Sequence, residues 1–128
     1  MKKQLVLSEM KNKLGICRLN NASAIPEWAV KGSFYSITRT QDELSVVCNQ
    51  EDIPESVDYE GEWRGLKVEG PLDFSLIGIL ASISSALAKK GISIFAISTY
   101  ETDYILMKDD KYKPAVEALE AEGFVVKQ

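Results

Sequence analysis

The chain has 128 residues, of which 45% are hydrophobic and 27% are charged. This composition supports one packed domain or two small ones and argues against disorder. The net charge is −4 and no run of Lys and Arg is longer than a pair, so nucleic acid is not an expected partner. No apolar stretch reaches membrane-spanning length and no signal-peptide pattern follows Met1, which predicts a cytoplasmic protein without a membrane partner.

Residue types that carry chemistry are few. The sequence contains no histidine, which is the commonest general base and metal ligand. It also contains no nucleophile beside a base and no glycine-rich phosphate loop. Cys17 and Cys48 lie in apolar strand-like runs without the close spacing of metal ligands or redox pairs, so we interpret them as buried thiols. These features predict a protein that is not an enzyme and that holds neither metal nor cofactor.

The first half of the chain is rich in strands. Apolar and β-branched runs predict strands over residues 4–9, 14–19, 34–38 and 44–48. Between them the sequence allows only short helical turns, one near Trp28 and one near Pro54. The polar residues 40–43 predict a hairpin turn between the third and fourth strands.

The second half is more regular. A strand over 63–69 leads into a helix over 75–90, whose apolar residues recur at intervals of three and four until Gly91 ends it. Strands are predicted over 92–97 and 104–107. A second helix is capped by Asp109 and Asp110, tolerates Pro114 because that residue falls in the first turn, and precedes a last strand over 124–126.

The order strand-helix-strand-strand-helix-strand is that of the ferredoxin-like plait, and the first half repeats this order in a fainter form. We therefore predict an α+β fold of two tandem ferredoxin-like βαββαβ units. The degenerate N-terminal unit, with shortened helices, is placed over residues 1–61, and the C-terminal unit over residues 62–128.

Several segments carry a resemblance to a known family. They are Trp28 with residues 34–40 and 42–48, and residues 70–75, 78–79 and 94–104, which include the specific sequence Ser-Thr-Tyr-Glu-Thr-Asp-Tyr. In these segments the chain resembles a bacterial family of small tandem ACT-domain proteins, related to the cytosolic arginine sensor of the TOR pathway in animals. The resemblance implies a regulatory module that binds an amino acid or a similar small molecule between two ACT units.

The resemblance also implies which residues line the pocket. The sensor is similar to two copies of this chain fused, so in this shorter chain the facing unit must come from a second molecule, and we expect a homodimer. The implied positions are Asp73 and Leu76 of the loop, Thr99, Tyr100 and Asp103 of the turn, and Ser93 and Ile94 of the facing unit. At Leu76 the sensor's ligand-binding unit carries an acid, so the resemblance does not specify arginine.

The residues themselves support part of this assignment. A pocket for an amino acid needs amide donors for the carboxylate and an acceptor for the ammonium. Asp73 or Asp103 is suited to accept the ammonium, and Ser98 opens the polar turn that contains Asp103. A glycine one turn into a helix costs about 1 kcal/mol against Ala, which suggests that a ligand or a strand approaches the backbone there. The donors are expected at the helix start, Phe74, Ser75, Leu76, Ile77 and Gly78.

Simpler interpretations of these residues stay open. Asp73 can be a helix N-cap without a ligand, Asp103 can fix the turn through its own backbone, and Tyr100 and Phe74 can be packing groups. The strand over 92–97 is apolar on both faces, so the sheet face without helices needs a cover. The sequence thus predicts a ligand-binding regulatory module that acts on a protein partner, or else a structural or protein-interaction module with a vestigial pocket.

Overall fold

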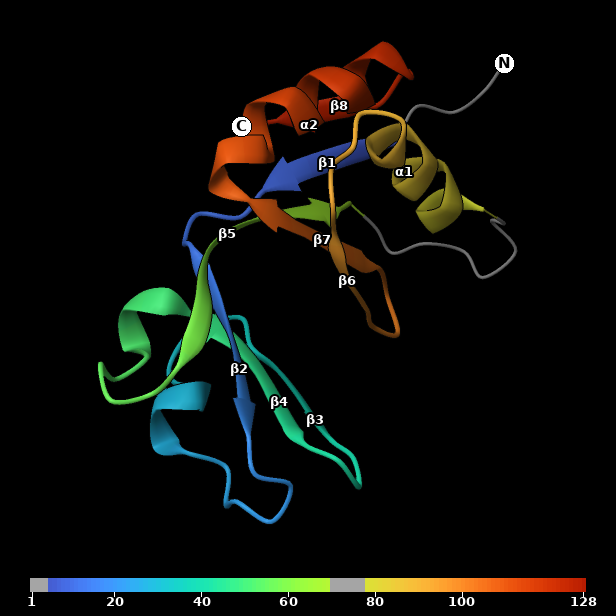
Figure 1. Ribbon diagram of the computed structural model, residues 1–128. Coiled ribbons are helices and arrows are strands. Elements are labelled where there is room, and N and C mark those ends of the chain that lie inside the picture. Colours follow the sequence, from blue (N-terminus) through green and yellow to red (C-terminus); the bar gives the residue numbers. More distant parts are fainter. Residues whose placement is uncertain (1–4, 70–77) are drawn as a thin grey trace. The chain divides into compact units, whose positions relative to one another are not determined.

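The computed structural model describes residues 5–69 and 78–128 (Figure 1). Their contacts divide the chain into two compact units. One, the N-terminal unit, is Asn12–Trp63, and the other, the C-terminal unit, combines Met1–Lys11 with Arg64–Gln128. The first strand of the chain belongs to the C-terminal unit. No helix among the described residues has the length and apolar character needed to cross a membrane.

The N-terminal unit is a small antiparallel sheet with two helical turns. Its strands lie in the order β3-β4-β2-β5, which is the order 2-3-1-4 of a ferredoxin-like plait. Each helix of the plait is reduced to a single 3-10 turn, as predicted. Cys17 and Cys48 are both buried in its core, which confirms their interpretation as buried thiols. The elements are β2 (Leu14–Leu19), η1 (Glu27–Val30), β3 (Ser36–Arg39), β4 (Leu44–Asn49), η2 (Gln50–Asp52) and the first residues of β5 (Tyr59–Val68).

The C-terminal unit is a fuller plait with one additional strand. Its strands lie in the order β6-β7-β5-β1-β8, and β1 is antiparallel to β5 and parallel to β8. The first strand of the chain therefore separates the two strands that would be neighbours in a simple plait. The elements are β1 (Val6–Glu9), the remainder of β5, α1 (Ile79–Ala88), β6 (Phe95–Ser98), β7 (Asp103–Lys108), α2 (Asp109–Ala121) and β8 (Val125–Lys127).

Both helices of the C-terminal unit share one hydrophobic core with the sheet. Ile83, Ala86 and Leu87 of α1 are buried there, and Ala86 and Leu87 follow Ile83 at the intervals of three and four residues that place side chains on one helix face. Leu119 of α2 is fully buried in the same core. Figure 1 shows α1 and α2 together beside β1. Gly91 follows α1 with φ 70°, the left-handed conformation that ends helices and suits glycine.

Two details of α2 differ from the prediction. Lys108 is the N-cap residue, and Asp109 and Asp110 occupy the first turn, where their charges favour the positive end of the helix dipole. Pro114 is the sixth residue of the helix and not part of its first turn. The ring removes the amide that would donate to the carbonyl of Asp110, and the helix continues because its inner face is buried on both sides of this position.

Strand β5 serves both units. Residues at its start pair with β2, for example Trp63 with Leu14, whereas Leu66 and Val68 near its end pair with β1. The strand predicted from the sequence begins only at Trp63. It does not include residues 59–62, which belong to the fourth strand of the N-terminal unit. Residues 59–62 are polar or glycine, so this segment has no apolar alternation by which local sequence could identify it.

Candidate functional site

The polar turn between β6 and β7 is the best defined part of the predicted site. Thr99 closes the turn on Thr102 with three hydrogen bonds. Its amide donates to the Thr102 carbonyl at 2.8 Å, its hydroxyl donates to the same carbonyl at 3.0 Å, and the hydroxyl oxygen accepts from the Thr102 amide at 3.2 Å. A turn closed in this way holds its backbone in one conformation, so the neighbouring side chains are presented from a fixed frame.

Thr102 attaches this turn to the end of β5. Its side chain is only 5% exposed, and its hydroxyl donates to the Val68 carbonyl at 2.5 Å. Val68 is the last residue of β5, immediately before the segment that contains the predicted loop. Thr102 is not among the site residues predicted from the sequence, although it lies within the polar sequence 98–104. Thr102 is buried, whereas residues 98–101 of the turn are exposed. This difference in burial is visible only in the folded structure.

Ser98 and Asp103 form a pair across the two strands. They lie opposite each other in the β6–β7 ladder, and the Ser98 hydroxyl donates to a carboxylate oxygen of Asp103 at 2.5 Å. Asp103 is half-buried, and the Ser98 hydroxyl orients its carboxylate. A carboxylate offers about four acceptor positions on two oxygens, so this contact leaves capacity for a ligand ammonium.

Gly78 lies at the start of α1 and not one turn into the helix, where the sequence placed it. It lies outside α1, as the N-cap residue, with φ 79°, and its carbonyl accepts from the Ser82 amide at 2.8 Å. A Cβ atom placed on Gly78 would meet no atom of the described residues within 4 Å. The left-handed backbone conformation is by itself a reason for glycine at this position.

The remaining predicted residues divide into two groups. Ser93 is exposed and Ile94 is half-buried on the segment between α1 and β6, and Tyr100, 83% exposed, lies at the tip of the turn. The other group lies outside the described residues and consists of Asp73, Phe74, Ser75, Leu76 and Ile77. Within the described part of the chain, no three acidic, cysteine or histidine side chains gather in a way that could hold a metal ion.

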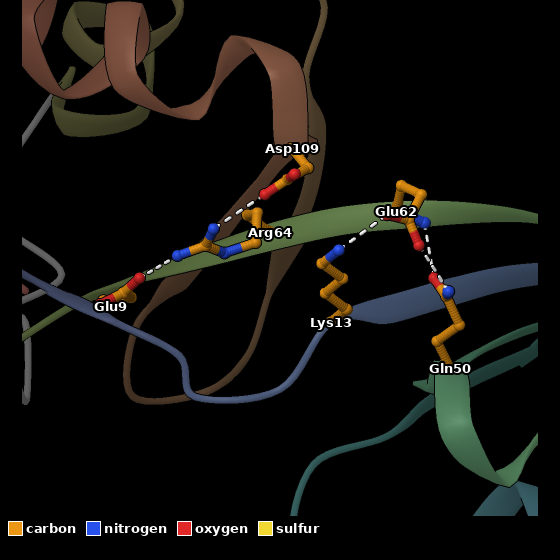
Figure 2. A network of polar contacts seen from close by, with 6 residues as sticks. All are labelled: Glu9, Lys13, Gln50, Glu62, Arg64 and Asp109. Carbon is orange, nitrogen blue, oxygen red and sulfur yellow. Dashed lines mark hydrogen bonds and ion pairs between the residues drawn. The ribbon is translucent and has the colours of Figure 1, made fainter.

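A charged cluster centred on Arg64 was not predicted from the sequence. The guanidinium donates to a carboxylate oxygen of Asp109 at 2.8 Å and to the Glu9 carboxylate (Figure 2). It also lies 4.2 Å from the centre of the Tyr112 ring, within the range of a cation–π interaction. This cluster links β1, β5 and the start of α2 within the C-terminal unit, which is a structural role.

Comparisons with known proteins identify both halves of the chain. A family model described as an ACT domain matches residues 58–121, and a model described as an N-terminal domain matches residues 12–56. The human cytosolic arginine sensor for mTORC1 subunit 1 is 37% identical over 59 residues, which is 45% of this chain and 18% of the sensor. The chain therefore spans about a fifth of the length of the arginine sensors that it matches.

Solved structures extend the likeness over the whole chain. A protein from Agobacterium tumefaciens superimposes with a TM-score of 0.92 and 37% identity, covering 98% of this chain and 93% of that protein. The ligand-free regulatory subunit of aspartate kinase from Thermus thermophilus superimposes with a TM-score of 0.58 over 90% of this chain and 93% of the subunit. Its identity is 13%, so the second comparison concerns the fold alone.

Proposed function

The chain belongs to the ACT-domain family, and on that premise we propose that it is a non-catalytic cytoplasmic protein that binds an amino acid and regulates a partner protein. The match to the ACT model over residues 58–121 supports a regulatory role for the C-terminal unit. The similarity to proteins named as cytosolic arginine sensors supports both the ligand class and the cytoplasm. A bound ligand would act by shifting the population of one arrangement that the partner recognises.

We place the ligand beside the β6–β7 turn. The observation that carries this proposal is the hydrogen bond from Thr102 to Val68, because it joins the polar turn to the strand that leads into the loop containing Asp73. The carboxylate of Asp103, oriented by Ser98, would accept the ligand ammonium. Amides at the helix start would donate to its carboxylate.

The opposite wall of the site would come from a second copy of the chain. Phe95 lies opposite Leu106 in the ladder, and Leu106 points away from Ile105 and Met107, which belong to the core beneath the helices. Phe95 and Ile97 are therefore half-buried on the sheet face that α1 and α2 do not cover. A second copy on this face would cover both residues and would bring its Ser93 and Ile94 to the ligand.

A thermal-shift screen of the full chain with each standard L-amino acid tests the proposal. A ligand at a hundred times its dissociation constant adds about 2.7 kcal/mol to the free energy of unfolding, so an amino acid that binds raises the melting temperature clearly. If none of them changes the melting temperature, the chain is instead a structural or protein-interaction module with a vestigial pocket.

Two variants locate the site. Asp73→Ala and Asp103→Ala should each abolish the ligand-dependent shift while the fold of the free protein persists. Ser98→Ala is the matched control for Asp103→Ala, because it removes the same hydrogen bond but keeps the carboxylate, and it should retain most of the shift. A shift that survives both aspartate substitutions would place the ligand elsewhere.

A further inference from the structure

The N-terminal unit contains an open hollow of its own. It has a volume of about 340 Å³ and is lined by Asn12, Lys13, Gln50, Glu51 and Tyr59. These residues come from the segment before β2, from η2 and from the start of β5, and all belong to one compact unit. The volume is near the lower end of the range of small-molecule sites, so the hollow has room for a ligand of amino-acid size.

A β-bulge contacts Lys13 and Gln50, two of the residues that line the hollow. Between Trp63, opposite Leu14, and Glu60, opposite Ile16, β5 carries one more residue than β2. Glu62 lies in this bulge with φ 63° and is the only non-glycine residue with positive φ among the described residues. Bulges and strained backbone conformations concentrate at functional positions, where they redirect a side chain.

Two hydrogen bonds between Gln50 and Glu62 hold the bulge in place. The Gln50 side-chain oxygen accepts from the Glu62 amide at 2.5 Å, and its side-chain nitrogen donates to a Glu62 carboxylate oxygen at 2.6 Å. The other carboxylate oxygen pairs with the Lys13 ammonium at 2.7 Å. Figure 2 shows Glu62 between Lys13 and Gln50. The bulge thus fixes the position of a cation at the edge of the hollow.

Tyr59 supplies an aromatic surface to the same hollow. A Cβ atom on Gly15 would lie 3.0 Å from one ring carbon of Tyr59, and a Cβ atom on Gly61 would lie 2.9 Å from another. The ring is therefore packed against the backbone at two glycines, and the side chain remains 38% exposed. An aromatic face held in this way attracts cationic groups.

The charges around the hollow favour a ligand that carries both signs. The Lys13 ammonium has three donors, so it can contact a ligand carboxylate together with Glu62. The Glu51 carboxylate lines the same hollow and is suited to an ammonium. Glu51 and Glu62 together outweigh Lys13, so the local charge disfavours a phosphate and favours a ligand with a cationic end.

We propose that this hollow binds a small zwitterion, of the size of a free amino acid, with its ammonium between Glu51 and the ring of Tyr59 and its carboxylate on Lys13. The site lies wholly in the N-terminal unit and is independent of the turn at residues 98–103. It would give the chain a second ligand position.

An NMR titration of the full-length ¹⁵N-labelled chain tests this site. The probes are the standard L-amino acids, with propionate and ethylamine as ligands that carry only one of the two charges. We expect at least one amino acid to shift the amide signals of Lys13, Glu51 and Tyr59 in a saturable way, with propionate and ethylamine at least about tenfold weaker, because each lacks one ion contact. Signals of Gly78 and of residues 98–103 report the other site in the same spectra, so each proposal can fail alone.

Matched variants decide whether the named side chains hold the ligand. Lys13→Met and Glu51→Gln should each weaken binding about tenfold, equal to about 1.4 kcal/mol. Lys31→Met, an exposed lysine of the same unit, should leave the dissociation constant within about twofold. The absence of saturable shifts at Lys13, Glu51 and Tyr59, equal binding of propionate or ethylamine, or equal effects of Lys13→Met and Lys31→Met would each overturn the proposal. Glu51→Gln keeps the test decisive if Lys13→Met fails to fold.

Discussion

The hydroxyl of Thr102 donates a hydrogen bond to the main-chain carbonyl of Val68, 34 residues earlier in the chain. The bond is buried, and it connects the turn between β6 and β7 to the last residue of β5. The turn is also closed internally by the hydrogen bonds between Thr99 and Thr102, so Thr102 both closes the turn and attaches it to the end of β5.

Thr102→Val tests this attachment, because it keeps the shape of the side chain and removes only the hydroxyl. We expect the free energy of unfolding to fall by about 1 kcal/mol, as the Val68 carbonyl loses a buried donor. Thr102→Ser keeps the hydroxyl, so its free energy of unfolding should fall by less than that of Thr102→Val. Urea denaturation of the three proteins measures the difference, and equal stability of the valine variant and the parent would show that the bond contributes nothing.

Arg64→Met should lower the free energy of unfolding more than Thr102→Val does. Arg64 and Glu9 have side chains that are each 24% exposed, so removing the guanidinium leaves a largely buried carboxylate without its cation. We expect a loss of about 2 kcal/mol in the free energy of unfolding, measured by urea denaturation.

Arg64→Lys is the matched control for that change. A lysine keeps the positive charge but cannot contact Glu9 and Asp109 with two separate nitrogen atoms. Its stability should therefore lie between those of the parent and Arg64→Met. A lysine variant as unstable as Arg64→Met would mean that the geometry of the fork, and not its charge, stabilises the cluster.

The backbone at Glu62 predicts an unusual order of stability between two variants. Glu62→Ala and Glu62→Gly both remove the ion pair with Lys13, but only glycine relieves the left-handed conformation at φ 63°. A non-glycine residue in this region costs roughly 1–2 kcal/mol. Glu62→Gly should thus be about 1 kcal/mol more stable than Glu62→Ala in urea denaturation, whereas at an ordinary strand position glycine would be the less stable of the two.

Tyr112 gives a prediction about alkaline pH. The pKa of its hydroxyl is raised to about 12, first by burial and then by the charge of Glu9, while the Arg64 cation acts in the opposite direction. In the unfolded chain the pKa is 10, so the unfolded state loses its proton first. The contribution of the Tyr112 hydroxyl to the free energy of unfolding is therefore fully present below pH 10 and is lost as the pH rises through 12.

Tyr112→Phe removes this titration and keeps the ring. Relative to the phenylalanine variant, the parent should lose roughly 2–3 kcal/mol between pH 10 and pH 12. Cys48, whose pKa burial also raises to about 12, titrates alike in both proteins and cancels from the difference. Parallel stability curves for the two proteins across this interval would contradict the prediction.

Local sequence was sufficient to predict most helices and strands. Strand β2 has the predicted bounds, 14–19, and the βαββαβ order of the C-terminal unit follows from its hydrophobic periodicity. The buried state of Cys17 and Cys48 also followed from their apolar neighbours. These features depend on residues near one another in the chain, so the amino-acid pattern contains them.

The partners of each strand were decided only by the tertiary structure. The pattern at residues 4–9 predicts a strand, but not that β1 lies between β5 and β8. The double use of β5, the contact of Thr102 with Val68 and the positive φ of Glu62 were equally invisible in the sequence. Each depends on contacts between segments far apart in the chain, and hydrophobic periodicity carries information about which side of an element is buried but none about which neighbour buries it.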